Sequence, residues 1–218
     1  MQGAVVRFDI AENGIMVPGP PAQNGFSAAN KLINFLMALY NGLASAILGF
    51  NAQNYGKSDY RRIRQGTRQS LIIMLIMYAF CLTAGLLLSI GGAYQHIFMS
   101  EDKISEASVR FGNTYLYVDF ILYFILGFLI VTRSAVQGIT KVGYVLGAGV
   151  AELVSRVLIC AYLPALVNGG ATDASASLAS FAAVCFGDPG AWLLASLVLL
   201  VPTVKYIFRM QYKKEVSG

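Results

Sequence analysis

An aspartate lies in an apolar stretch of the chain, between two tyrosines at helical spacing. Tyr115, Asp119 and Tyr123 are four residues apart, which places one carboxyl group and two aromatic rings on a single helix face. An ionisable side chain in hydrocarbon is costly unless it finds water or a partner, so it is a candidate for function. This face suits the binding of a proton or a cation, and the rings suit an organic cation held face-on. The alternative is that Asp119 lies near the outer end of its helix and contacts water and lipid headgroups.

A second apolar stretch contains an acid and a base four residues apart, Glu152 and Arg156. At this spacing a carboxylate and a guanidinium group meet on one helix face and can neutralise each other in a low-dielectric environment. A structural ion pair is therefore the favoured interpretation. A proton relay through the same two side chains is the alternative.

Polar side chains also recur along one face of an earlier apolar stretch. Asn34 and Asn41 belong to this face, together with Asn30 and Ser45. They can line a cavity, or they can hydrogen-bond across a helix interface, which is a common use of asparagine in membranes. The three cysteines lack a Cys-x-x-Cys spacing, and the lone His96 has no partner at metal-ligand spacing. We therefore expect neither an enzyme nor a metal site.

The composition indicates that these side chains lie in a membrane. Of the 218 residues, 56% are hydrophobic and only 12% are charged, whereas about 25% of a soluble domain is charged. Since about 20 apolar residues cross the hydrocarbon core as a helix, we predict an all-α integral membrane protein with a bundle of about five transmembrane helices. The predicted parts are an irregular segment at 1–26, a transmembrane region at 27–210 with spans near 28–50, 71–94, 115–131, 142–167 and 189–210, and a tail at 211–218.

The last predicted span carries its own start signal. We expect Asp188 as the N-cap residue of this helix, with Pro189 at its first helical position. Residues 178–186 are apolar but too short to cross a membrane alone. They are interpreted either as an extension of the last helix or as an interfacial segment.

Lysine and arginine residues are concentrated in alternate loops. The loop at 51–68 is strongly basic, the short loop with Arg133 and Lys141 is basic, and so is the tail, whereas the loops at 95–111 and 168–187 are not. Basic loops remain in the cytoplasm, so we predict an outside N-terminus and a cytoplasmic C-terminus in the inner or plasma membrane of the cell. The net charge of +5 then reflects topology, and we expect no nucleic-acid partner.

Five short motifs, in order and with matching spacing, give the chain a family resemblance over about residues 26–210. It resembles the multidrug and toxic compound extrusion (MATE) transporters, which carry a helix start rich in small residues, an A-Q-N-x-G segment and a basic cytoplasmic loop. The motifs are Phe26-Ser27-Ala28-Ala29-Asn30-Lys31, Ala52-Gln53-Asn54-Tyr55-Gly56 with Arg61-Arg62-Ile63-Arg64, Arg133-Ser134-Ala135-Val136-Gln137-Gly138, Glu152-Leu153-Val154-Ser155-Arg156, and Asp188-Pro189-Gly190-Ala191-Trp192.

The resemblance implies a fold and a function. Members of that family have twelve spans in two six-helix lobes, and this chain resembles the second lobe without its first helix. The resemblance implies part of an antiporter that exports organic, often cationic, compounds or drugs in exchange for protons or sodium ions, with no other cofactor. We expect it to be inactive alone and to need a missing N-terminal half. The alternatives are a truncated membrane protein that does not transport, or a fragment of a flippase for lipid-linked substrates with the same broad fold.

Overall fold

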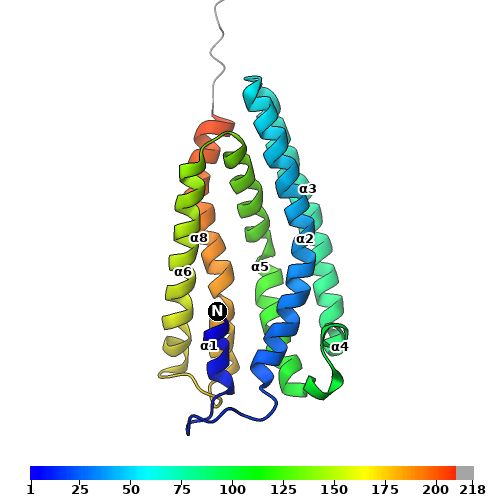
Figure 1. The fold of residues 1–218 in the computed structure, drawn as a ribbon, viewed down its shortest axis with the longest axis vertical. Coiled ribbons are helices and arrows are strands. Elements are labelled where there is room, and N and C mark those ends of the chain that lie inside the picture. The colour runs from blue at the N-terminus through cyan, green and yellow to red at the C-terminus, as the bar shows by residue number, and fades with distance from the viewer. Residues whose placement is uncertain (210–218) are drawn as a thin grey trace, which may run out of the picture.

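The structure is a computed structural model and describes residues 1–209 of the chain. These residues form helices and connecting turns, and their only β-type pairing is a single bridge between Ile10 and Met16. Five helical segments are long and apolar enough to cross a membrane, which confirms the predicted all-α membrane bundle (Figure 1). They are α2 (Pro21–Gly56), α3 (Tyr60–Ser89) continued by η2 (Ile90–Gly92) and α4 (Ala93–Phe98), α5 (Glu106–Gly138), α6 (Val142–Asn168), and α7 (Leu178–Cys185) continued by α8 (Gly187–Pro202) and η4 (Thr203–Phe208).

Helix α5 is the centre of the bundle. It lies between the α2–α3 pair and the α6–α8 pair and contacts both (Figure 1). A helix that is apolar on all sides is suited to such a buried position. The close approach of α2 requires glycine, because a Cβ atom on Gly25 would overlap the main chain at Ser108 and Gly112. In contrast, most of α6 faces outward and is free to contact lipid.

The helices are longer than the predicted spans, because hydropathy marks only the part of a helix that lies in hydrocarbon. The stretch 51–68, predicted as a loop, is the end of α2 and the start of α3 joined by a turn. Its Asp59 side chain accepts a hydrogen bond from the Arg62 amide at 3.0 Å and so caps α3. Helix α5 starts with a capping box formed by Ser105 and Ser108.

The span predicted at 71–94 lies within the segment Tyr60–Phe98, which a kink interrupts near its end. Helix α3 stops at Ser89 because Gly91 and Gly92 adopt positive φ angles of 61° and 72°, a conformation that favours glycine. The chain then forms the short helix α4 (Ala93–Phe98), where His96 lies, and the turn η3 (Glu101–Lys103) before α5 begins.

The N-terminal segment, predicted as irregular at 1–26, contains two short helical elements that contact α2. They are α1 (Gln2–Val6) and η1 (Arg7–Asp9), and α2 starts at Pro21. Asp9 is buried, and its two carboxylate oxygens accept hydrogen bonds from the amides of Ala22 and Gln23, both at 2.9 Å. Asp9 therefore caps α2 from a distance, since Pro20 at the N-cap has no side chain able to do so.

The predicted tail at 211–218 and Met210 at the end of the last predicted span lie outside the described residues.

Candidate functional site

Asp119 lies deep in the bundle on α5. Its helix starts at Glu106, so the carboxyl group is 13 residues from that start, about 20 Å along the helix axis at 1.5 Å per residue. The residue is 0% exposed, and within residues 1–209 neither carboxylate oxygen has a hydrogen-bond partner. The alternative interpretation placed Asp119 near the helix end, in contact with headgroups and water. This buried position does not match it.

Tyr115 and Tyr123 share the buried face of α5 with Asp119, as their spacing predicts. The Tyr115 hydroxyl donates to Asp188 Oδ2 at 3.2 Å. The Tyr123 hydroxyl donates to the Ile33 carbonyl at 3.4 Å, and its ring centroid lies 6.2 Å from that of Trp192. Both tyrosines are buried, and in this conformation their rings pack between helices and present no open face to a large cation.

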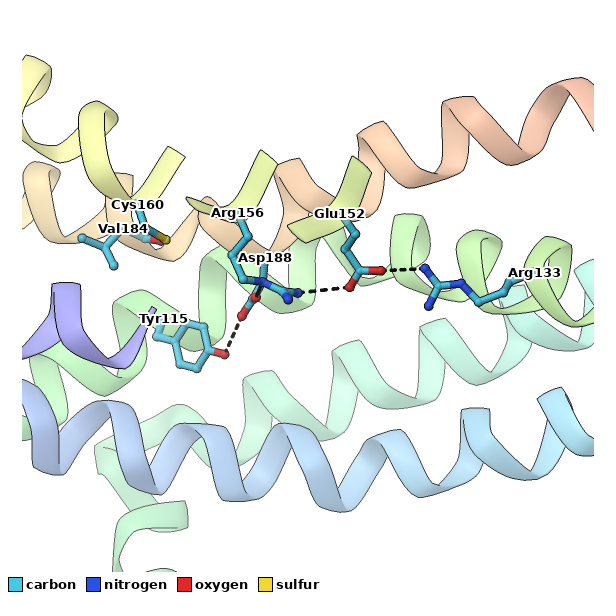
Figure 2. A network of polar contacts seen from close by, with 7 residues as sticks. All are labelled: Tyr115, Arg133, Glu152, Arg156, Cys160, Val184 and Asp188. Carbon is cyan, nitrogen blue, oxygen red and sulfur yellow. Dashed lines mark hydrogen bonds and ion pairs between the residues drawn. The ribbon is translucent and has the colours of Figure 1, made fainter. Parts of the chain in front are cut away.

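Four charged side chains form a continuous network between α5, α6 and α8 (Figure 2). Glu152 accepts a hydrogen bond from Arg133 Nη2 at 2.6 Å and one from Arg156 Nη2 at 3.2 Å, through different carboxylate oxygens. Arg156 also donates through Nε to Asp188 Oδ1 at 2.8 Å. The predicted ion pair between Glu152 and Arg156 is thus present as one link of a longer series.

The network joins three helices and carries no net charge. Arg133 lies on α5, Glu152 and Arg156 on α6, and Asp188 on α8. These side chains are 17–31% exposed, so each is partly desolvated and depends on its partner for stability in a membrane. With Tyr115 at one end and Arg133 at the other, the series runs along 18 residues of α5, or about 27 Å.

Sequence reasoning missed two members of this network. Arg133 was expected in a loop, but α5 continues to Gly138 and directs this side chain towards Glu152. Asp188 was expected as the N-cap of the last helix, but the N-cap is Phe186 and Asp188 lies inside the first turn of α8. Because α7 leads almost directly into α8, the Asp188 carboxylate is free to bind Arg156. Residues 178–186 therefore extend the last span at its N-terminal end, which was one of the two interpretations of this segment.

Asn34 and Asn41 are not brought into this site. Both are exposed on α2, and neither amide side chain hydrogen-bonds within residues 1–209. Uncovered amides are unfavourable in hydrocarbon, so this face of α2 is suited to contact with water or with another polar surface.

No group of three His, Cys, Asp or Glu side chains within residues 1–209 is placed to hold a metal ion. Asp119 is instead a single acceptor without a partner, and its chemistry suits a proton or a monovalent cation.

The fold and this interior define a class: a polytopic helical membrane protein with ionisable groups inside its bundle, as in proteins that move ions or solutes. The MatE family model matches residues 16–162, which is more than half of the chain, so this chain belongs to the MatE family of membrane efflux transporters. The matched region includes Asp119, Glu152 and Arg156, whereas Asp188 lies beyond it. Comparison with curated proteins and with solved structures gives no significant match.

Proposed function

We propose that this chain supplies the second lobe of an antiporter that exports organic, often cationic, compounds in exchange for protons or sodium ions. The observation that carries the proposal is the buried carboxyl group of Asp119, neither oxygen of which has a hydrogen-bond partner in the part of the chain that the structure describes. A buried polar group normally finds a partner, so an orphaned acid in the centre of a bundle is suited to an exchangeable partner. A bound proton or sodium ion supplies that partner. After the ion leaves, the buried carboxylate has no partner and is energetically unfavourable.

The proposed exchange requires a second set of helices. Alternating access in such transporters comes from two lobes that rock about a shared site near the middle of the membrane. The five described spans amount to one lobe at most (Figure 1). The exposed asparagines on α2 support a neighbouring polar surface, and we propose that they face the cavity between the lobes. The complementary helices belong to another chain or to another part of a longer protein.

The proposed orientation places the α2–α3 turn in the cytoplasm. Lys57 and Arg61 are exposed at that turn, and such cations resist translocation across the membrane. The N-terminal segment, α4 and the α6–α7 connection lie at the opposite end of the bundle (Figure 1), which is therefore the outer end.

The experiment measures accumulation of a fluorescent organic cation in cells. Four strains carry this chain alone, this chain with a complementary seven-span half, and the pair with either Asp119→Asn or Asp173→Asn in this chain. Asp173 is a matched control because it is an acid in the outer connection, where hydrogen bonds from the Ser175 hydroxyl and amide lower its pKa. Efflux is expected only from the paired halves, with loss in Asp119→Asn and retention in Asp173→Asn at equal protein levels.

Strong efflux by this chain alone would contradict the two-lobe proposal. Unchanged efflux by the Asp119→Asn pair would remove Asp119 from the coupling site.

A further inference from the structure

A basic and aromatic cluster lies where the start of α6 meets the end of the last span. Lys141 precedes α6 and Tyr144 is in its first turn, whereas Lys205 and Tyr206 belong to η4. The two lysine Nζ atoms lie 4.9 Å and 5.1 Å from the centroid of the same Tyr206 ring. The Tyr144 ring centroid lies 6.1 Å from that of Tyr206. We refer to these four residues as the lysine–tyrosine cluster.

The backbone of η4 contributes to this arrangement. Thr203–Phe208 is wound as a π-helix, and the Arg209 amide donates to the Val204 carbonyl five residues earlier at 2.8 Å. A π-helical turn is wider than an α-helical one and occurs frequently at functional sites. Here it presents Lys205 and Tyr206 to the start of α6.

The charge of the cluster is not balanced within residues 1–209. The ion pairs of this part of the chain involve Arg62, Arg133 and Arg156, and neither lysine takes part in one. A tyrosine ring stabilises each ammonium group modestly but brings no negative charge. Two ammonium groups that share one ring therefore favour an anion close to the cluster.

The position in the membrane identifies the anion. The cluster lies at the end of the bundle that carries the α2–α3 and α5–α6 turns (Figure 1), and tyrosine is enriched at the level of lipid headgroups. Close to the cluster in the sequence, Val142 and Leu146 on α6 and Val201 on α8 are exposed apolar side chains, at 47%, 67% and 60%. An amphipathic ligand at this place would contact the two lysines with its polar group and the exposed apolar side chains with its hydrocarbon chains.

We propose that the lysine–tyrosine cluster binds the phosphate group of an anionic phospholipid, whose acyl chains lie along the exposed faces of α6 and α8. This site lies apart from Asp119 and its network and does not depend on the proposed antiport. Bound lipid would hold the start of α6 against the end of the last span.

The test is lipid retention by the purified, delipidated chain, measured by native mass spectrometry. Phosphatidylglycerol and phosphatidylcholine with the same acyl chains are titrated against the wild type, Lys141→Gln/Lys205→Gln, and the control Lys57→Gln/Arg61→Gln. The control removes two exposed cations at the same end of the bundle, outside the cluster. A parallel arm adds inorganic phosphate or glycerol phosphate as a competitor, which distinguishes a lipid site from a site for free phosphate.

The cluster variant is expected to bind phosphatidylglycerol about 30-fold more weakly, which at 1.4 kcal/mol per tenfold corresponds to about 1 kcal/mol per lysine. The control is expected to stay within about twofold of the wild type, as surface charges away from the site contribute little. Phosphatidylcholine binding is expected to be the same in all three proteins. Equal weakening in both variants, no weakening in the cluster variant, or displacement of the lipid by millimolar free phosphate would each overturn the proposal.

Discussion

Removal of Arg156 gives the sharpest test of the charge network. In Arg156→Met, Glu152 keeps its bond to Arg133, but Asp188 retains only the Tyr115 hydroxyl. Loss of one partner from a buried ion pair costs about 3–5 kcal/mol. The Arg156 and Asp188 side chains are 31% and 17% exposed, so we expect the low end of that range, about 3 kcal/mol. At about 2–4 °C per kcal/mol for a chain of this size, the apparent Tm should fall by about 6–12 °C.

Two double variants then identify the true partner of Arg156. Arg156→Met with Asp188→Asn removes the stranded carboxylate and leaves the pair of Arg133 and Glu152 intact, so most of the lost stability should return. Arg156→Met with Glu152→Gln leaves both Arg133 and Asp188 unpaired and should be at least as unstable as the single variant. Helical spacing alone pairs Arg156 with Glu152. It therefore predicts that the double variant with Glu152→Gln is more stable than the one with Asp188→Asn.

The assay is thermal loss of the monodisperse peak in detergent, followed by fluorescence-detected size-exclusion chromatography at matched expression. If Glu152→Gln rescues Arg156→Met and Asp188→Asn does not, the network described here is wrong.

Three further predictions concern topology, packing and capping. A single cysteine at Tyr60 should resist a membrane-impermeant thiol reagent in intact cells, whereas one at Glu101 should react; the reverse pattern would invert the proposed orientation. Gly25→Ala should lower the free energy of unfolding by about 2–3 kcal/mol, because its Cβ overlaps the main chain of α5. Gly49→Ala, with open space around it, should be neutral or stabilising by up to about 1 kcal/mol, and equal effects of the two substitutions would refute the close α2–α5 contact. Asp9→Ala should lower the free energy of unfolding by about 1 kcal/mol through loss of the cap on α2, and full stability in the same chromatographic assay would show that the cap is dispensable.

The membrane bundle and part of the site follow from local sequence patterns. Apolar runs of about 20 residues predict five spans, because a helix of that length crosses the hydrocarbon core. Such a helix also satisfies its backbone groups internally. The shared face of Tyr115, Asp119 and Tyr123 follows from helical spacing alone, and so does the contact between Glu152 and Arg156. These features need no knowledge of how the helices pack.

The remaining features depend on contacts between helices. Arg133 and Glu152 are 19 residues apart, and Arg156 and Asp188 are 32 residues apart, so no helical period relates them. The sequence predicts a loop at Arg133 because the apolar run ends before it, whereas α5 continues to Gly138. The burial of Asp119 likewise follows from the central position of α5 between two helix pairs, which hydropathy does not specify.

Ion binding at Asp119 can be measured directly on this chain by tryptophan fluorescence. Trp192 is the only tryptophan, and it packs against Tyr123, one helical turn from Asp119. Titration of the purified chain with sodium, or with protons across a pH series, should produce a saturable change in fluorescence in the wild type and in Asp173→Asn. The change should be absent in Asp119→Asn. An identical titration curve in Asp119→Asn would contradict the assignment of Asp119 as the exchangeable ion or proton site.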